Sequence, residues 1–353
     1  MKKTIAIFGA RSIALGAYKA IQKLYPDCLV KCFIVTNKKN NPDVLAGLPV
    51  VSLSDFSDKE AQVIIATPEN LHQEISKSLG EHGCERYISL DSRKESKLMA
   101  QYFAACGLFP TLHHYPLGSS KANVCVYMAK FHRDQPLRQS FSIPEWVVPI
   151  QVGAALTENR VCEKLDNDGE HISHKNPNYC ELTATYYVWK NELAKYKDTD
   201  YVGICHYRRV WDISDEDLAR ISENNIDVIL PLPLLHEPDI REHHTRYVKD
   251  SDWDAMIRAI RELQPEYFED FPRIFEQEFM YNYNMVIAKK EVFHDYCSWL
   301  FPILERIEEY SVPKGNERND RYIGYLGENL TTLYFMHNQN RLKIAHTGRL
   351  MLT

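Results

Sequence analysis

The sequence has 353 residues, of which 44% are hydrophobic and 25% charged, and its 42 basic and 48 acidic side chains give a net charge of −6. This length is about twice that of a typical domain, so we expect two domains, and the composition excludes a disordered or collagen-like chain. The acidic balance argues against a nucleic-acid-binding protein, because phosphate tracking requires clustered Lys and Arg.

Neither a leader peptide nor a membrane-spanning segment is expected. The start MKKTIAIFGARSIALGAYKA interrupts its apolar run at Arg11, and no window of about 18 uncharged apolar residues occurs. Nine cysteines are scattered singly without a Cys-x-x-Cys pair, which is typical of reduced thiols rather than of a disulfide framework or a zinc site. We therefore expect a cytoplasmic protein.

Residues 1–107 alternate between short apolar runs and segments with helical periodicity. Strands are predicted over residues 3–10, 28–37, 61–67 and 86–92, and helices over residues 11–26 and 69–83. Strands that alternate with helices imply a parallel sheet covered on both faces. This part of the chain is predicted to be a Rossmann-like domain.

The first strand-to-helix turn of such a domain is the expected ligand site, because free backbone N–H groups at a helix start attract phosphate. The dinucleotide pattern Gly-x-Gly-x-x-Gly is broken here, since Arg11 and Ala14 stand where glycines should follow Gly9. These departures argue against NAD and favour a structural or partner-docking domain. The hypothesis that remains for this turn is that Gly9, Arg11 and Ser12 bind a sugar nucleotide or another anion.

The segment LFPTLHHYPLGSSK, with two prolines and Gly118, is predicted to join the two domains. The net charge changes there, from +3 over residues 1–107 to −9 over residues 108–353. The second part also alternates, which again implies an α/β sheet. Strands are predicted over residues 123–131, 146–156, 201–211, 226–235 and 281–290, and helices over residues 181–196, 251–265 and 290–310.

Functional residues are expected in residues 166–211, which combine Asn, Glu, Tyr, Trp, His and two adjacent arginines. His206, Tyr207, Arg208 and Arg209 lie where the predicted strand runs into a polar turn, and open α/β sheets bind ligands outside the carboxyl ends of their strands. Alternation along a strand predicts that His206 and Arg208 share one face while Tyr207 and Arg209 take the other.

Four motifs occur in order along the second part: NPNYCELTATYYVWKN, YVGICHYRRVW, YNYNMVIAKKEVFHDYCSWLF and RYIGYLGENLTTLYF. Over about residues 122–345 they resemble the capsular and exopolysaccharide glycosyltransferase family of the DUF4422 type, some of whose members are galactofuranosyltransferases. The resemblance implies a GT-A-like glycosyltransferase domain over residues 108–353, a UDP-sugar donor, and a polysaccharide or lipid-linked glycan acceptor. A lipid-linked acceptor implies peripheral attachment at the inner face of the membrane.

Residues 1–107 resemble, in pattern, the Rossmann-like domain at the N-terminus of bacterial sugar O-acyltransferases. That resemblance is compatible with the anion-binding hypothesis for Gly9, Arg11 and Ser12.

Transfer of a sugar from UDP requires stabilisation of the departing diphosphate, and the usual device is Mn²⁺ or Mg²⁺ held by Asp-x-Asp at a strand's carboxyl end. Two such triplets occur, but Asp166-Asn167-Asp168 lies in a loop and Asp198-Thr199-Asp200 precedes its strand. Arginines stand at the expected strand end instead, and their forked donors suit phosphate oxygens. A metal is therefore possible but not favoured.

Arg208 or Arg209, together with His206, is expected to stabilise the leaving diphosphate. The structural alternative is an ion-pair network between the arginines and Glu181. Glu181 opens a predicted helix, where a carboxylate complements the helix dipole. Its functional alternatives are positioning of the arginines and hydrogen bonding to a donor hydroxyl.

An inverting transfer needs a base that deprotonates the acceptor hydroxyl. Glu328, which follows a glycine at an expected helix start in GYLGENL, is the candidate general base, with a helix-terminal carboxylate as the structural alternative. The candidates for substrate binding are Lys130, Asn176, Tyr179, Glu181, Asn284 and Arg321.

The pairs His171/His174 and His243/His244 lack a third ligand at a suitable spacing, so surface or substrate contacts are expected there rather than a metal. We expect a hexosyltransferase, with galactofuranosyl as the group that the resemblance favours. The alternatives are a non-catalytic sugar-nucleotide-binding or regulatory subunit of a polysaccharide assembly complex, and an NAD-dependent sugar-modifying enzyme.

Overall fold

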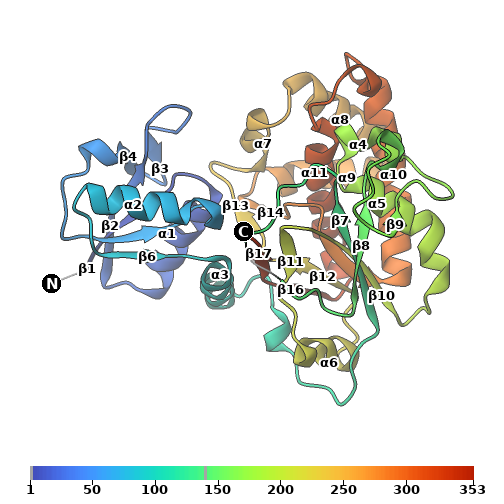
Figure 1. Ribbon diagram of the computed structural model, residues 1–353, viewed down its shortest axis with the longest axis horizontal. Coiled ribbons are helices and arrows are strands. Elements are labelled where there is room, and N and C mark those ends of the chain that lie inside the picture. Colours follow the sequence, from blue (N-terminus) through green and yellow to red (C-terminus); the bar gives the residue numbers. More distant parts are fainter. Residues whose placement is uncertain (1–2, 139–140) are drawn as a thin grey trace.

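The computed structural model describes residues 3–138 and 141–353, which form two α/β units lying side by side (Figure 1). Each unit is built on one large sheet, and both sheets are mixed but mostly parallel. Among the helices of the described residues, none is long and apolar enough to cross a membrane.

The first sheet has the strand order β3-β4-β2-β1-β5-β6. Its strands are β1 (Lys3–Phe8), β2 (Cys28–Val35), β3 (Val44–Leu45), β4 (Leu48–Ser52), β5 (Gln62–Ile65) and β6 (Tyr87–Ser89). Neighbours are parallel except in the β3–β4 hairpin. The four strands predicted for residues 1–107 are confirmed, whereas the hairpin has no counterpart among them.

Helices cover both faces of the first sheet. Side chains alternate between the two faces along each strand, and here both sets are apolar and need to be buried. Ile5 and Ile7 of β1 pack under α1 and α3, whereas Ala6 and Phe8 pack on the opposite face under α2. The helices of this unit are α1 (Ser12–Leu24), α2 (His72–Glu81) and α3 (Ser92–Cys106).

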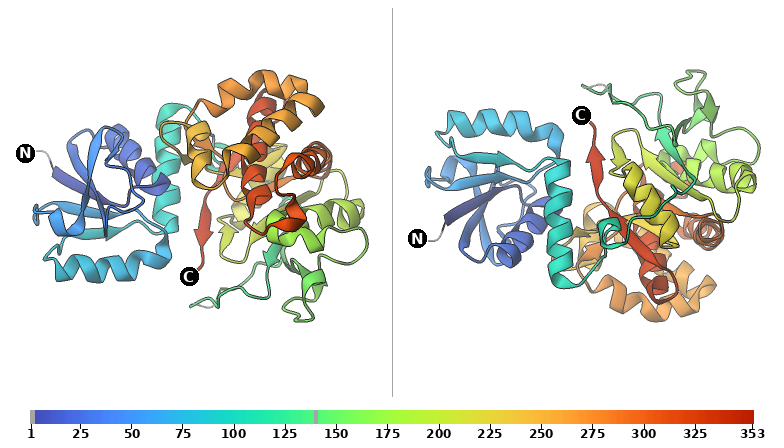
Figure 2. Two further views of the ribbon diagram at one scale, coloured as in Figure 1. Left: turned by 90° about the horizontal axis from the view of Figure 1, so that it is seen from above. Right: turned by 90° about the horizontal axis from the view of Figure 1, so that it is seen from below.

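Helix α3 lies between the two units, beside the C-terminal strand β17 (Arg349–Met351) (Figure 2). It is N-capped by the side chain of Asp91 and ends at Gly107, whose φ of 69° suits glycine. A buried ion pair joins it to β17, with 3.1 Å between Glu95 Oε1 and Arg349 Nη2. The last strand of the chain is thereby tied to the first unit.

Apolar packing also joins the units. Leu232 and Leu235, from the second unit, belong to the core under the first sheet. The ring of Phe279 lies edge-on against those of Phe103 and Phe109, with centroids 5.8 and 5.1 Å apart. A shared hydrophobic core of this kind fixes the relative placement of the two units.

The second sheet has the order β16-β12-β15-β10-β7-β8-β9, with β11 paired to β10 and β17. Strand β15 is antiparallel to both of its neighbours. The strands are β7 (Val124–Lys130), β8 (Val147–Gln151), β9 (Lys164–Leu165), β10 (Tyr201–His206), β11 (Arg209–Trp211), β12 (Val228–Pro231), β15 (Val286–Lys289) and β16 (Ile344–Thr347). A small separate pair consists of β13 (Leu234–Leu235) and β14 (Phe279–Met280).

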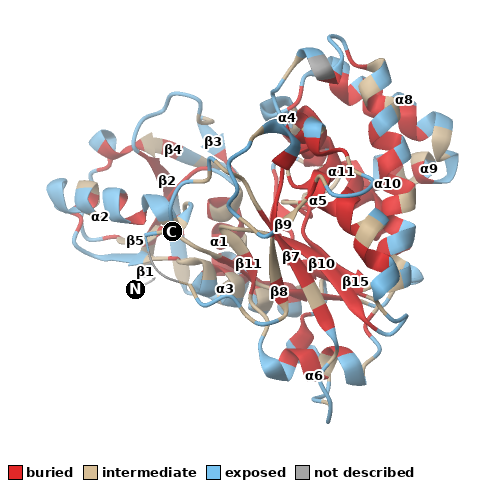
Figure 3. Cartoon of the chain, turned by 45° about the vertical axis from the view of Figure 1, so that its right-hand side comes forward, coloured by how far each residue is buried: buried red, intermediate tan, exposed pale blue. Residues whose placement is uncertain are grey.

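The second sheet is a buried layer between helices (Figure 3). Val126 and Met128 of β7 pack in the core beside α6, whereas Tyr127 and Ala129 face the larger core of α5, α8, α10 and α11. The helices are α4 (Asn176–Tyr179), α5 (Leu182–Tyr187), α6 (Asp215–Glu223), α7 (Ile240–His243), α8 (Asp250–Leu263), α9 (Pro265–Phe275), α10 (Lys290–Tyr310) and α11 (Tyr322–His337).

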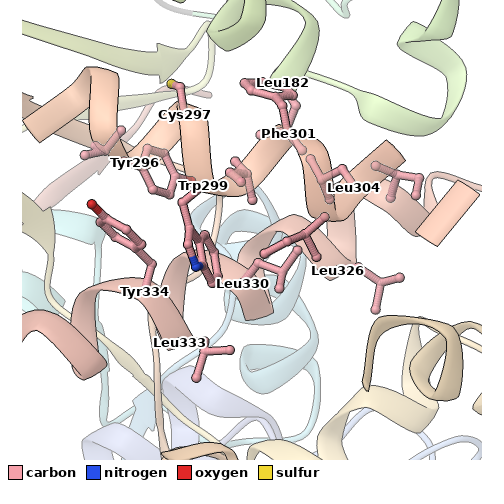
Figure 4. Close-up of a cluster of buried hydrophobic side chains, with 14 of the residues drawn as sticks. Leu182, Tyr296, Cys297, Trp299, Phe301, Leu304, Leu326, Leu330, Leu333 and Tyr334 are labelled. Atoms are coloured by element: carbon pink, nitrogen blue, oxygen red, sulfur yellow. The ribbon is translucent and has the colours of Figure 1, made fainter. Parts of the chain in front are cut away.

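Helices α10 and α11 form the centre of the larger core, where Trp299 lies next to Leu330 and Tyr334 (Figure 4). The predicted helix over residues 290–310 is confirmed. The predicted helix over residues 181–196 is only partly right, because the α-helix widens into a π-helix over Val188–Glu192. The buried Glu192 carboxylate there accepts hydrogen bonds from Tyr127 and Tyr187.

A buried ion pair gives a stability prediction for the second unit. Asp252 of α8 is fully buried and accepts two hydrogen bonds from the Arg318 guanidinium, at 2.8 and 2.7 Å. Asp252→Ala should lower the free energy of unfolding by about 3 kcal/mol, because it leaves a buried charge with fewer partners. Urea denaturation measures this loss. The exposed Asp254→Ala, on the same helix, is the matched control, and equal stability of the two variants would contradict the prediction.

Candidate functional site

A cavity of about 720 Å³ lies between the two units. The first unit lines it with residues that follow strands β1, β2 and β5, including Gly9, Asn37 and Thr67. The second unit lines it with residues at the end of β10, before β15 and on α11. The carboxyl ends of parallel strands are where α/β sheets bind ligands, and the volume falls within the range of about 300–1,000 Å³ seen for small-molecule sites.

Glu328 lies in the middle of α11 rather than at a helix start as the sequence suggested. It is next to Gly327, where a Cβ atom would lie 2.7 Å from Leu182 Cδ1, so a larger residue would force the buried Leu182 side chain to shift. The Glu328 carboxylate lines the cavity and accepts a hydrogen bond from Asn282 Nδ2 at 3.0 Å and one from the backbone of Tyr283.

The pKa of Glu328 is raised to about 7. Burial is the main cause, and the negative charge of Glu181 adds to it, while the hydrogen bond from Asn282 and the charge of Arg209 act in the opposite direction. A carboxyl group with this pKa is about half ionised at neutral pH. A pKa close to the working pH is the one that best suits a general base.

A chain of hydrogen bonds links Glu328 to the first unit. Because Asn282 donates to Glu328, its Oδ1 accepts from His236 Nε2, 3.2 Å away. His236 Nδ1 then accepts from the hydroxyl of Ser12, at 3.1 Å, at the start of α1. Burial lowers the pKa of His236 to about 4, so the ring is neutral and able to accept this hydrogen bond.

This chain of hydrogen bonds leads to a prediction about the pKa of Glu328. Asn282→Ala should raise the pKa of Glu328 above about 7, by about one unit, because it removes a hydrogen bond to the charged form. Titration of ¹³C-labelled glutamate followed by NMR measures the shift. Ser12 lies two hydrogen bonds beyond Asn282, so Ser12→Ala should give a smaller shift in the pKa of Glu328. An unchanged pKa of Glu328 in Asn282→Ala would contradict the prediction.

His206 ends β10, and its Nε2 donates to the carbonyl oxygen of Tyr283 at 2.6 Å. Burial lowers the pKa of His206, so the ring is neutral at neutral pH and adds no positive charge. Tyr283 and Asn284 both have positive φ, 78° and 48°, which is uncommon for non-glycine residues and marks a constrained site. Asn284 uses its amide to donate to Glu181 Oε1 at 2.7 Å, so it orients a carboxylate that lines the cavity.

Arg208 and Arg209 are separated rather than side by side. Tyr207 and Arg208 form a two-residue turn, so that His206 pairs with Arg209 across the β10–β11 hairpin. The predicted placement of His206 and Arg208 on one strand face is therefore wrong, because the chain reverses direction after His206. Arg209 lines the cavity, with its guanidinium 4.3 Å from the ring centre of Tyr283, whereas Arg208 Nη2 donates to the Gln135 carbonyl at 3.4 Å.

Several other candidates from the sequence do line the cavity: Gly9, Arg11, Ser12, Glu181 and Arg321. Arg321 lies just before α11, and its Nε is 3.2 Å from the Cys180 sulfur. The structural alternative, an ion-pair network of Arg208 and Arg209 with Glu181, does not form among the described residues. The Glu181 carboxylate instead lies 3.9 Å from Nε2 of the neutral His206 ring.

Besides the buried Asn284, three predicted substrate-binding residues lie outside the cavity. Tyr179 is fully buried and its hydroxyl donates to Glu308 at 2.9 Å. Asn176 is also buried, and its amide donates to the carbonyl of Cys180 at 2.8 Å. Lys130, at the end of β7, lines two smaller pockets instead. The first two therefore support the loop before α5 rather than contact a ligand.

The Asp-x-Asp triplets do not fit a divalent ion. Asp166 is fully buried, and its two oxygens already accept hydrogen bonds from the backbone of Gly153 and Ala154 at 2.9 and 3.0 Å. Asp198 pairs with Lys290, and Asp200 accepts from a backbone N–H within its own turn. Over residues 3–138 and 141–353, no three His, Cys, Asp or Glu side chains gather as metal ligands.

Sequence reasoning missed His236 and Asn282. His236 follows the predicted strand over residues 226–235, so the strand-end rule that singled out His206 applies to it equally. Asn282 stands two residues before Asn284 in the YNYN segment. His243 and His244, considered as metal ligands, line the cavity, and the ring centre of His243 lies 3.7 Å from that of His236.

The comparisons with known proteins concern mainly the second unit. The family model described as Domain of unknown function (DUF4422) matches residues 127–339. The apo structure of the WbbM bifunctional glycosyltransferase aligns with a TM-score of 0.56 and 29% identity, over 66% of this chain and 46% of WbbM. The chain thus spans less than half the length of WbbM.

Core-mannan synthase A (CmsA/Ktr4) from Aspergillus fumigatus, in its Mn/GDP form, aligns over 98% of this chain and 72% of its own, but the TM-score of 0.22 and 9% identity support no inference. A search of the curated proteins found no match. Because its family model covers more than half of the sequence, the chain belongs to the family described as Domain of unknown function (DUF4422).

Proposed function

We propose that this chain is a glycosyltransferase that moves a hexosyl group from a UDP-sugar to a polysaccharide or lipid-linked glycan acceptor, with galactofuranosyl as the first group to test. The similarity to WbbM, at 29% identity, supports the class of reaction. The observation that carries the proposal is the carboxyl group of Glu328, whose pKa of about 7 suits a base and which lines the same cavity as Arg209 and Arg321.

In the proposed reaction, Glu328 takes the proton of the acceptor hydroxyl as its oxygen bonds to the anomeric carbon. The bond from that carbon to the diphosphate oxygen breaks, and the diphosphate leaves with the electron pair. Arg209 and Arg321 stabilise its negative charge, a role that the sequence assigned to Arg208 or Arg209 with His206. Neither Arg209 nor Arg321 has a carboxylate within ion-pair distance in the part of the chain described, so both charges are available to a ligand.

We also propose a division into a Rossmann-like domain over residues 1–107 and a GT-A-like domain over residues 108–353. The strand order of the first sheet and the end of α3 at Gly107 support this boundary. The function is tested by measuring UDP release from a panel of UDP-sugars, with and without glycan acceptors. Binding of a UDP-sugar without release of UDP in any pairing would favour a non-catalytic subunit.

The proposal includes a transfer without a divalent cation, because both Asp-x-Asp triplets are engaged in structural contacts and an arginine stands at the strand end. An excess of EDTA should therefore leave the initial rate of UDP release within about twofold of the untreated rate. Loss of activity in EDTA that is restored by Mn²⁺ or Mg²⁺ would contradict this part of the proposal.

A further inference from the structure

A second group of cationic side chains lies at the cavity, on the boundary of the two units. Arg11, at the start of α1, and Lys39, after β2, both line the cavity from the first unit. Arg246 comes from the second unit, in the short turn that follows α7. Arg246 is exposed and does not line the cavity, but the positive charge of Arg11 adds to burial in lowering its pKa, so the two charges lie near each other.

This cationic group lacks a neutralising carboxylate. Arg11 donates to the backbone carbonyl of Asn40, and the described residues provide no acidic partner within ion-pair distance of Arg11, Lys39 or Arg246. Like charges that approach without a counter-charge repel each other, and a bound anion removes that repulsion.

A buried polar side chain lines the cavity at the same place. His243 is only 8% exposed, and its ring has no hydrogen-bond partner among the residues that the structure places. Burial, together with the charges of His236, Arg246 and Arg11, lowers the pKa of His243 to about 2. The neutral ring therefore has one N–H donor that is free to bind a ligand in the cavity.

The two cationic groups of the cavity differ in their surroundings. Arg209 and Arg321 lie in the part that holds the carboxylates of Glu181 and Glu328, where the proposed function places the donor diphosphate. We propose that Arg11, Lys39 and His243, which line the cavity, form a second anion subsite with Arg246 at its edge, and that this subsite binds a phosphate or diphosphate group of the acceptor. The acceptor is then a phosphate-bearing glycan that binds together with the donor, and the first unit is part of the substrate-binding site.

This inference rests on the proposed function only in one respect, the assignment of Arg209 and Arg321 to the diphosphate of the donor. It is tested by isothermal titration calorimetry with sodium pyrophosphate, on protein already saturated with UDP. Wild-type protein should bind pyrophosphate under these conditions. The double variant Arg11→Gln/Arg246→Gln should lose at least about tenfold in pyrophosphate affinity, while its affinity for UDP stays within about twofold.

The matched control is the double variant Lys23→Gln/Arg241→Gln. It removes one exposed cation from α1 and one from α7, neither of which lines the cavity, and should bind both ligands as wild type does. Displacement of pyrophosphate by UDP, with weaker UDP binding in Arg11→Gln/Arg246→Gln, would assign these residues to the donor and overturn the second subsite. Absence of pyrophosphate binding to wild type would overturn it too. Pyrophosphate binding through Arg11 in a protein that does not bind UDP would support the anion subsite and overturn the donor assignment.

Discussion

Glu328→Gln is expected to lower kcat by about 10²–10⁴-fold, because the amide cannot accept the proton of the acceptor hydroxyl. Its similar size and shape should leave the affinity for UDP within about twofold. For wild type, kcat/KM should rise with pH through about 7, the pKa of Glu328, since the base acts in its ionised form. In the variant, this ascending limb should be absent.

The measurement is the initial rate of UDP release between about pH 5 and pH 9, with UDP affinity measured separately by calorimetry. Glu266→Gln is the matched control, because Glu266 is an exposed carboxylate on α9 that does not line the cavity. An active Glu328→Gln variant that keeps the ascending limb would remove Glu328 from the reaction.

Arg209→Gln should lower kcat by about 10²–10³-fold, the usual effect of removing one group that stabilises charge in the transition state. Arg208→Gln should have an effect at least tenfold smaller, because Arg208 lies outside the cavity and contacts Gln135. The two residues are of the same type and adjacent in the sequence. A tenfold or greater difference in kcat between the two variants would therefore be explained by the turn at residues 207–208, which separates their side chains.

Steady-state kinetics with both variants measure this difference, and Arg209→Lys is a useful third variant. Lysine keeps the charge but not the fork of donors, so it should recover only part of the lost rate. Equal losses in Arg208→Gln and Arg209→Gln would contradict the separation of the two side chains, and a full rate in Arg209→Gln would contradict the role given to Arg209.

The sheets and their long helices were predictable because the pattern of apolar residues that marks a buried strand or helix lies within a short stretch of sequence. Runs such as residues 3–8 and 201–206 are apolar enough to be buried on both faces, and the 290–310 segment keeps its helical periodicity on both sides of Pro302. The widening of the helix at Val188–Glu192 was not predictable, because it accompanies a buried Glu192 whose partner Tyr127 comes from β7.

The site was predicted as two separate places, and the structure joins them into one. Local sequence patterns cannot place Ser12 next to His236, because the two residues are 224 positions apart and meet only through the fold, where they are hydrogen bonded. Residues 206–209 were also predicted as one extended strand, whereas β11 folds back to pair with β17 near the end of the chain. Both outcomes depend on long-range contacts, which local periodicity does not encode.

Two residues of the family-like motif lie outside the cavity, contrary to what their position suggested. Asn176 and Tyr179 precede Glu181 in a polar loop, which suggested ligand contacts. Instead their polar groups satisfy buried neighbours, the carbonyl of Cys180 and the carboxylate of Glu308. A polar motif thus reflects the hydrogen-bonding needs of a buried loop as readily as those of a ligand.

The central claim is that the cavity between the two units binds the diphosphate of the donor against Arg209 and Arg321, with Glu328 facing the sugar. A crystal structure of the protein soaked with UDP tests it most directly. The predicted result is a diphosphate whose oxygens accept hydrogen bonds from Arg209 and Arg321 inside the cavity. A nucleotide bound beside Lys130 and Arg208 instead, with the cavity unoccupied, would contradict it.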